Sequence, residues 1–303
     1  MKKDFLIKDD FINSRLDRWF RKNVCDVPQS LIEKSIRKGR IKINNKKEKS
    51  SYKIQKNDQI SIYKFNFFKK PQKQILKNYI PSKKDILSTT NYIIEDNENF
   101  SIINKPQGIA VQSGTKSRKN ILDILKSSKE FKDHKPFCVH RIDKDTSGAL
   151  IVAKNRKYAQ LFTSLFRIRK IHKTYLAIVL GHFEKSKGTL KDTVFHYEGK
   201  KKIASNAITH FNVIDSNYSY TLLGLNPETG RKHQLRQQLL MHGHPILGDK
   251  KYRLREAKDK KNSNLMLHSY KIHFLISDVK YNFTAKPNSL FLNMLKEKYL
   301  KIY

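Results

Sequence analysis

Apolar residues at helical spacing predict two short helices near the start of the chain. The first follows Ser14, a candidate N-cap, and the second runs from Pro28 to Gly39, because proline favours a first helical turn and glycine a helix end. Alternating apolar and polar residues then predict strands at 40–43 and 59–63, bounded by asparagine and aspartate turns. The apolar helix faces consist of Leu16, Trp19, Phe20 and Val24, and of Leu31, Ile32 and Ile36.

Later segments alternate strand-like and helical patterns. Two apolar runs within 93–105 surround a turn-forming stretch and predict a β-hairpin. Continuous apolar runs at 149–153 and 176–180 predict buried strands. A helix capped by Asn155 is expected at 158–166, with its tyrosine, leucine and phenylalanine residues on one face.

Periodicity is lost between residue 64 and about residue 90, where lysine and proline predominate. This composition predicts a solvated basic linker at 66–90. We therefore expect a small domain at 13–65 and a larger domain at 91–303, which is long enough to enclose its own core.

The charge of the chain points to a polyanionic partner. Lysine and arginine total 63 against 27 aspartate and glutamate residues, a formal net charge of +36. Such a charge attracts nucleic acid. Composition alone leaves open a biased genome rich in lysine, asparagine and isoleucine, and a basic protein of a membrane surface.

Compartment signals favour the cytoplasm. The first residues include Asp4, Asp9 and Asp10 and lack a sustained apolar core, so they resemble neither a signal peptide nor a transit peptide. The longest apolar runs have five residues, far below the roughly 20 that span a bilayer. Cys25 and Cys138 lie far apart and are expected to be reduced structural thiols. We expect a cytoplasmic protein that does not enter membranes.

Residues 13 to about 63 resemble the S4 RNA-binding domain. The resemblance rests on SRLDRWFRKNV, SLIEKSIRKGRIKINN and NDQI, with asparagine at 45 and 57 where that family usually has glycine. It implies that Arg15, Arg37 and Lys38 follow RNA phosphates. A solvated basic face is the alternative.

The stretch PFCVHRIDKDTSGALIVAKN places a dense polar loop before a buried strand. Its His140, Arg141, Asp143 and Asp145 combine carboxylates, a guanidinium and an imidazole on a rigid support, as active sites do. Taken alone, the loop favours a well-capped turn over an active site, because Asp, Thr, Ser and Gly are ordinary turn residues. Lys105, which follows an expected strand, fits either a surface lysine or a phosphate contact.

HRIDKDTSG resembles the HRLD-x-x-TSG signature of the RluA, RluC and RluD family of pseudouridine synthases, with Ile142 for leucine. KTYLAIVLGH and PETGRKHQLRQQLLMHGHPILGDKKY resemble two further blocks of that family. This sequence departs from the family pattern at two places. Gln237 and Gln238 stand where the family usually has a Val-His pair, and Arg253 stands where it often has glycine. The resemblance covers residues 91 to about 275, and INKPQGIAVQSG with the preceding S4-like unit is most similar to the RluC type.

This resemblance implies a role for each matched residue. Asp143 is the expected catalytic carboxylate, Tyr175 the active-site tyrosine, and Arg236 the basic partner of the carboxylate. The expected RNA contacts are Arg141, which helps to extrude the target base, together with His140, Arg231 and Lys105.

The implied fold is α+β: a small S4-like domain followed by a catalytic domain with a mostly antiparallel mixed sheet. The implied activity is isomerisation of uridine to pseudouridine in large-subunit (23S) ribosomal RNA or its precursor. No cofactor is expected, because the reaction breaks an N-glycosidic bond, turns the uracil and joins its C5 to the sugar without a redox step. We expect a monomer that requires no protein partner.

The chemistry agrees with these residue types. A carboxylate close to the sugar can act as nucleophile or start loss of the C2′ hydrogen, and a nearby guanidinium favours its charged form. A tyrosine offers a flat face for a flipped uracil, and unpaired uridines are the expected targets because flipping them costs least. A basic stripe that leads to Tyr175 either guides RNA or is simply solvated. It comprises Arg167, Arg169, Lys170, His172 and Lys173.

Other sites and functions fit the sequence less well. The histidines at 233, 242, 244 and 268 lack metal-ligand spacing, and no metal is predicted. A silent RNA-binding assembly factor would keep the fold but lose Asp143, Tyr175 or Arg236, and all three are present. A two-carboxylate glycosidase using Asp143 and Asp145 would require an aromatic sugar cleft.

Overall fold

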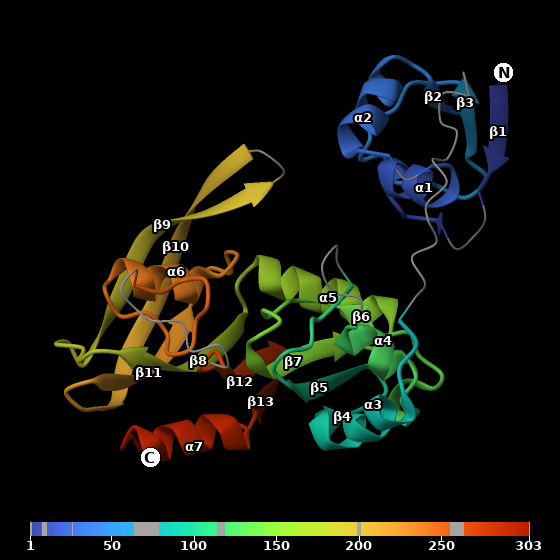
Figure 1. Cartoon of the computed structure of the whole chain (residues 1–303). Coiled ribbons are helices and arrows are strands. Elements are labelled where there is room, and N and C mark those ends of the chain that lie inside the picture. Colours follow the sequence, from blue (N-terminus) through green and yellow to red (C-terminus); the bar gives the residue numbers. More distant parts are fainter. Residues whose placement is uncertain are drawn as a thin grey trace. The chain divides into compact units, whose positions relative to one another are not determined.

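The computed structural model describes residues 2–7, 11–25, 27–63, 79–113, 119–198, 201–254 and 264–302. The chain divides into two compact units, Met1–Asn78 and Tyr79–Tyr303 (Figure 1). Each unit has its own buried apolar core. In the described part of the chain, no helix is long and apolar enough to cross a membrane.

The first unit packs two helices on a small antiparallel sheet. Helices α1 (Leu16–Asn23) and α2 (Gln29–Arg37) cover strands β1 (Lys2–Leu6), β2 (Ile41–Ile43) and β3 (Gln59–Tyr63), in the order β1-β3-β2. The two predicted helices and two predicted strands are confirmed. Strand β1 was not predicted, because its side chains are mostly exposed and its sequence lacks a clear alternation of apolar and polar residues. The core includes Leu16, Trp19, Phe20, Ile32 and Ile36.

The helix ends of this unit follow the expected residues with one exception. The predicted N-cap at Ser14 is wrong: its hydroxyl donates to the Phe11 carbonyl (2.6 Å), and Arg15 occupies the N-cap position. Pro28 precedes α2, and Gly39 adopts a φ of +66° directly after it, as a helix stop requires. Asn45 and Asn57 have φ values of +63° and +67°, so asparagine here accepts the left-handed backbone that favours glycine.

The second unit is built on a ten-stranded mixed sheet. Its main order is β4-β5-β7-β12-β8-β11-β10-β9, with β6 paired to β7 and β13 to β12. All pairs are antiparallel except β7 with β12, which confirms the predicted α+β fold with a mostly antiparallel sheet. The strands are β4 Ile93–Asp96, β5 Phe100–Lys105, β6 Phe137–Cys138, β7 Ser147–Ala153, β8 Ile171–Leu180, β9 Lys187–Glu198, β10 Lys201–Ser216, β11 Tyr220–Pro227, β12 Leu267–Ile276 and β13 Val279–Thr284.

Helices cover both faces of this sheet. Figure 1 shows α5 over β5 and β7, and a long β9–β10 hairpin that extends beyond the other strands with α6 alongside. Phe162 of α5 packs in one core, whereas Leu239 of α6 and Phe291 of α7 pack in the other. The helices are α3 Lys83–Leu87, α4 Ile121–Lys126, α5 Arg156–Arg167, α6 Gln234–Met241 and α7 Ser289–Glu297, with 3-10 turns at Ser88–Tyr92 and Lys129–Phe131.

The segment expected as a linker at 66–90 is described only in part. Residues 64–78 lie outside the described residues. From Lys83 the chain forms α3, which begins with a capping box between Ser82 and Asp85. Asp85 also pairs with Lys119 of the second unit, so this end of the segment belongs to that unit.

Strand β7 is the rigid support of the polar loop that precedes it. It lies between β5 and β12, and all seven of its residues are buried. Ile151 and Val152 face opposite cores, as strand alternation requires. Gly148 has a φ of +108°, and a Cβ there would lie 2.2 Å from the Ser269 carbonyl oxygen. The loop of Asp143 therefore joins the sheet at a point where the backbone is tightly constrained.

Candidate active site

A solvent-open pocket with a cavity volume of about 100 Å³ lies where the polar loop, β8, the end of β11 and the start of α6 meet. The predicted catalytic residues Asp143, Tyr175 and Arg236 all line it. Arg141 and Arg231, two of the predicted RNA contacts, line the same pocket and are exposed. Other lining residues are Ile142, Thr146, Lys173, Thr229, His233 and Leu267.

Arg236 joins two carboxylates at the base of the pocket. Its Nη1 donates to Asp143 Oδ2 at 3.1 Å, while Nε and Nη2 donate to Asp249 at 2.6 and 2.8 Å. Asp249 is buried and also accepts the backbone N–H groups of Lys251 and Tyr252, each at 2.9 Å. The guanidinium is therefore held in a fixed plane by Asp249 and presents its remaining edge to Asp143.

Both groups of the buried pair are stabilised in their charged forms. Burial opposes the charge on Arg236, but the hydrogen bonds and charges of Asp249 and Asp143 outweigh burial and raise the Arg236 pKa above its ordinary value. Burial alone would raise the pKa of Asp249, yet Arg236 and the two backbone donors hold it below its ordinary value. Sequence reasoning missed Asp249, although it lies in the GHPILGD segment that carried the resemblance.

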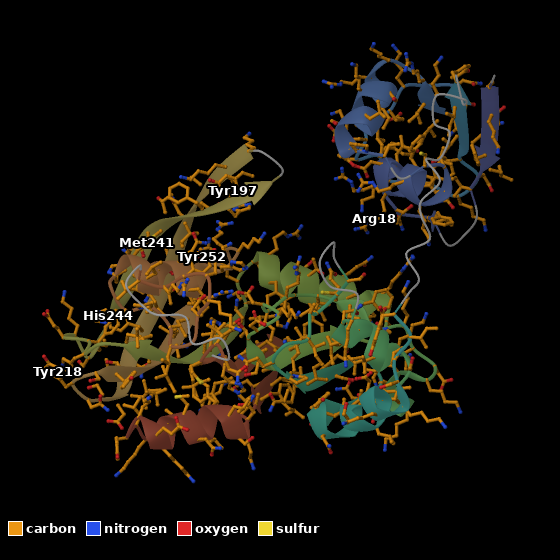
Figure 2. The ribbon with its side chains drawn as sticks, viewed as in Figure 1. Arg18, Tyr197, Tyr218, Met241, His244 and Tyr252 are labelled. Atoms are coloured by element: carbon orange, nitrogen blue, oxygen red, sulfur yellow. The ribbon has the colours of Figure 1, made fainter. Side chains whose placement is uncertain are left out.

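Helix α6 is anchored so that Arg236, in its first turn, faces the pocket. The Gln234 side chain accepts from the Thr229 hydroxyl (2.8 Å) and donates to the Ile208 carbonyl (3.1 Å), while Leu239 packs in the core. The Tyr252 ring, labelled in Figure 2, lies 5.1 Å from the Arg236 guanidinium carbon. Two carboxylates and an aromatic ring thus fix the guanidinium from several sides.

His233 is a pocket residue to which the sequence assigned no role. It precedes α6 in a left-handed conformation, with a φ of +54°. Its Nδ1 lies 2.9 Å from the Tyr252 hydroxyl, and its Nε2 lies 3.8 Å from Asp143 Oδ1. Burial lowers the His233 pKa, although the charge of Asp143 opposes that shift. The only available signal was its place in the TGR-x-HQ segment.

Tyr175 serves both the core and the pocket. It lies on β8, is 9% exposed, and packs in the same core as Leu176 while lining the pocket. Burial raises the Tyr175 pKa to about 12, with the Ser269 hydroxyl opposing and the Asp143 charge adding to the shift. The phenol therefore stays protonated at neutral pH and can donate a proton or a hydrogen bond.

The prediction that Lys105 contacts RNA phosphate is wrong. The side chain is 0% exposed, and its ammonium donates to the carbonyls of Pro106 (2.8 Å), Ile109 (2.8 Å) and Lys144 (3.2 Å). Burial lowers its pKa to about 7, against the opposing charges of Asp145 and Asp143. Lys105 ties β5 to the loop of Asp143 instead of facing solvent. A lysine that follows a strand gives no sequence signal of this burial.

His140 is committed to the protein backbone. Its Nε2 accepts the N–H of Ile151 at 2.9 Å, and its ring packs on Phe166 with centroids 4.6 Å apart. Burial, together with the charge of Lys173, lowers the His140 pKa to about 3. The ring is neutral at physiological pH, so His140 offers no cation to a phosphate.

The remaining predicted RNA contacts lie in the first unit. Arg15, Arg37 and Lys38 are exposed, and Arg15 pairs with Asp17 at 2.6 Å. Among the histidines once considered for metal binding, His242 pairs with Asp192, and His268 contacts Ser147 and the Ala285 carbonyl. Within the residues described, no group of three or more histidine, cysteine, aspartate or glutamate side chains is placed to hold a metal ion.

Comparisons with known proteins agree on one family. Residues 99–241 match the family model described as RNA pseudouridylate synthase. A protein of Buchnera aphidicola subsp. Schizaphis graminum named ribosomal large subunit pseudouridine synthase C is 34% identical over 304 residues, covering 95% of each chain. Its namesake from Rickettsia conorii is 37% identical over 261 residues, covering 80% of this chain and 82% of that protein. The solved structure of human RNA Pseudouridylate Synthase Domain Containing 4 has a TM-score of 0.61 and 26% identity, covering 72% of this chain and 97% of that one.

The match to the family model contains the loop of Asp143, the strand of Tyr175 and the helix start with Arg236. The sequence relatives extend over nearly the whole chain. A pocket that combines a carboxylate, a protonated phenol and a fixed guanidinium suits a reaction at a glycosidic bond. This chain belongs to the RNA pseudouridylate synthase family and is an RNA pseudouridine synthase.

Proposed function

We propose that this enzyme converts uridine to pseudouridine in large-subunit ribosomal RNA, with Asp143 as its catalytic carboxylate. The relatives that match most of the chain carry the name ribosomal large subunit pseudouridine synthase C. The net charge of +36 supports an RNA substrate of high charge density. We further propose that the enzyme acts in the cytoplasm, as a monomer and without a cofactor.

One observation carries the assignment of Asp143. Its carboxylate lines the pocket and accepts a hydrogen bond from a guanidinium whose Nε and Nη2 donate to Asp249. Arg236 can therefore orient Asp143 while Asp249 holds the guanidinium in place. An oriented carboxylate close to the sugar can attack C1′ or start loss of the C2′ hydrogen, after which the N-glycosidic bond breaks.

The other pocket residues have roles that suit the remaining steps. Tyr175 provides a flat wall for the detached uracil while it turns, and its protonated phenol can relay a proton once C5 has joined the sugar. Exposed Arg141 and Arg231 lie at the pocket, where they can hold the displaced backbone of the flipped nucleotide. Unpaired uridines are the expected targets, because unstacking costs least there.

The first unit is proposed to bind RNA away from the reacting uridine. Residues 13–65 would act as an S4-like domain in which Arg15, Arg37 and Lys38 contact phosphates. Residues 91–303 would form the catalytic domain together with residues 79–90, which lie in the same compact unit, and the preceding basic segment would join the two domains. Base identity would then be read in the pocket, and affinity would come largely from phosphate contacts.

The purified enzyme and transcripts of both ribosomal RNAs test this function. The enzyme is incubated with large-subunit or small-subunit RNA after exhaustive chelation, and pseudouridines are mapped by chemical sequencing. We expect new pseudouridines at defined uridines of the large-subunit transcript. Equal modification of both RNAs would refute the proposed substrate, and restoration of activity only by an added metal would refute the cofactor-free reaction.

A further inference from the structure

Lys173 lies beside Tyr175 on the face of β8 that lines the active-site pocket. Residues two apart on a strand point to the same side, and both residues line the pocket. They are separated along the strand by roughly 7 Å. The catalytic roles of Asp143, Tyr175 and Arg236 make no use of Lys173.

The Lys173 side chain is only partly exposed, and its ammonium lacks a counter-ion. Within the described residues, the Lys173 Nζ makes no hydrogen bond or ion pair. Its one cation–π contact is with the Phe166 ring, whose centroid lies 5.9 Å away. Burial lowers the Lys173 pKa. Its positive charge is also strong enough at this point to help depress the pKa of His140. A desolvated cation with no anion beside it favours binding of an anion.

The other cationic side chains of the pocket have hydrogen-bond partners or are exposed to solvent. Arg236 is committed to Asp249 and Asp143, and Arg231 donates through Nε to the Asn206 carbonyl at 3.1 Å. Arg141 is exposed. Asp143 is the one carboxylate in the pocket lining described here, and it shares Arg236 with Asp249. The same lining holds four cationic side chains, those of Arg141, Lys173, Arg231 and Arg236, so the pocket has an excess of positive charge.

We propose that Lys173 binds the phosphodiester group attached to the nucleotide whose base enters the pocket. With the uracil against Tyr175, the neighbouring phosphate would reach the next side chain on the same face of β8, where Lys173 stands. The contact offsets the desolvation of both the ammonium and the phosphate, and it fixes the flipped nucleotide at its backbone. Lys173 is in this sense a binding residue. The inference rests on the proposed function of the pocket.

Charge-changing variants of the full-length enzyme test this contact. Lys173→Met keeps the aliphatic stem and removes the charge, Lys173→Arg keeps the charge, and Lys170→Met removes an exposed charge outside the pocket lining. Affinity for a fluorescent large-subunit RNA fragment is measured over a range of salt concentrations. We expect Lys173→Met to weaken binding about tenfold, as loss of one charged hydrogen bond does. Its logarithmic salt slope should fall by about 0.7. Lys173→Arg should keep both quantities near those of the unchanged enzyme.

Three outcomes would overturn the contact. They are an unchanged affinity and salt slope for Lys173→Met, an equal loss for Lys170→Met, and a Lys173→Met enzyme that binds normally but loses its saturated single-turnover rate. The last would place Lys173 in the chemistry instead. Pseudouridine formation by the unchanged enzyme is measured in parallel, so that a failure of the proposed function is seen separately from a failure of the phosphate contact.

Discussion

Arg236 serves two carboxylates with one guanidinium, and the geometry separates its two tasks. The bidentate pairing with Asp249 fixes the plane of the guanidinium, and the single bond to Asp143 orients the carboxylate that we propose to be catalytic. A lysine at this position could restore the charge, but it could not satisfy both carboxylates in a defined plane. The site therefore depends on arginine for geometry as well as for charge.

We predict that Arg236→Met will lower the saturated single-turnover rate by at least a hundredfold while RNA affinity changes only a few-fold. Removing one member of a buried ion pair leaves Asp249 without its partner, a loss of about 3 to 5 kcal/mol. Arg236→Lys should retain more of the rate. Quench-flow measurement of pseudouridine formation at saturating RNA checks this. A variant that loses affinity but keeps its saturated rate would make Arg236 an RNA contact.

The lowered pKa of the buried Lys105 should make the free energy of unfolding depend on pH. Its pKa is about 7 in the folded protein against 10.5 ordinarily, so between those values the unfolded chain binds a proton that the folded chain does not. Its contribution therefore becomes more favourable as pH rises from about 7 toward 10. Lys105→Met removes the donor that three carbonyls share, of which the Lys144 carbonyl keeps the Gly108 N–H at 2.9 Å. It should destabilise the second unit by about 1 to 3 kcal/mol at neutral pH.

Urea unfolding of both proteins at pH 7 and pH 9 measures this difference. We expect the gap in unfolding free energy between the unchanged protein and Lys105→Met to widen at pH 9. A gap that is constant or narrower at pH 9 would mean that Lys105 is charged in the folded state.

The sequence supports predictions for residues whose role is tied to a short contiguous motif. Asp143, Tyr175 and Arg236 are recognisable from their motifs, and the structure brings them to one pocket. The role of Asp249 as partner of Arg236, and the role of Lys105 in tying β5 to the loop of Asp143, could not be predicted. The partner of Arg236 is 13 residues away and is specified by a turn, and the burial of Lys105 depends on three carbonyls from two separate loops.

At the scale of elements, strand β7 couples the catalytic loop to the sheet through Gly148. A side chain at this position meets the backbone of Ser269 on β12, and the φ of +108° is itself unfavourable for other residues. Gly243, which follows α6, also has a positive φ of +80°, but open space surrounds it. The two glycines differ mainly in the room available for a Cβ.

We predict that Gly148→Ala will destabilise the second unit much more than Gly243→Ala. The control should cost about 1 to 2 kcal/mol, the strain of a left-handed backbone. Gly148→Ala adds a backbone clash that requires β7 or β12 to move, so activity should fall as well. Thermal unfolding and a pseudouridine assay measure both effects. Equal losses of stability in the two variants would contradict this account of β7.

Elements with a clear apolar period were predictable, and elements shaped by pairing were not. Helix α5 begins after Asn155, whose side chain accepts the Tyr158 N–H at 3.0 Å, and the hairpin of β4 and β5 forms as its pattern indicates. The long β9–β10 hairpin was not predicted, because charged and polar residues alternate irregularly along it. Its strands are defined by pairing with each other and with β11.

At the scale of the whole molecule, the proposed function separates the reaction from part of the RNA affinity. The pocket lies entirely in the second unit, whereas Arg37 and Lys38 are exposed on the first. The net charge of +36 could be predicted from composition, but composition does not say which cations contact RNA. The burial of Lys105 shows that a cation in a motif need not face a phosphate.

We predict that replacing Arg37 and Lys38 together by glutamine will weaken RNA binding and lower its salt slope, with little change in the saturated rate. Each lost phosphate contact should reduce the slope by about 0.7. Fluorescence anisotropy over a salt series provides the measurement, and replacement of Lys280 and Lys301, exposed on the second unit, provides the control. A salt slope equal to that of the unchanged enzyme would count against RNA binding by the first unit.

The most direct test of the central claim is the single-turnover rate of Asp143→Asn beside Asp145→Asn. Both changes remove one carboxylate from the same loop and keep its shape, but only Asp143 contacts Arg236 and lines the pocket. With saturating large-subunit RNA, we predict no measurable pseudouridine from Asp143→Asn, RNA affinity within a few-fold of the unchanged enzyme, and a nearly unchanged rate for Asp145→Asn. Substantial turnover by Asp143→Asn would contradict its assignment as the catalytic carboxylate.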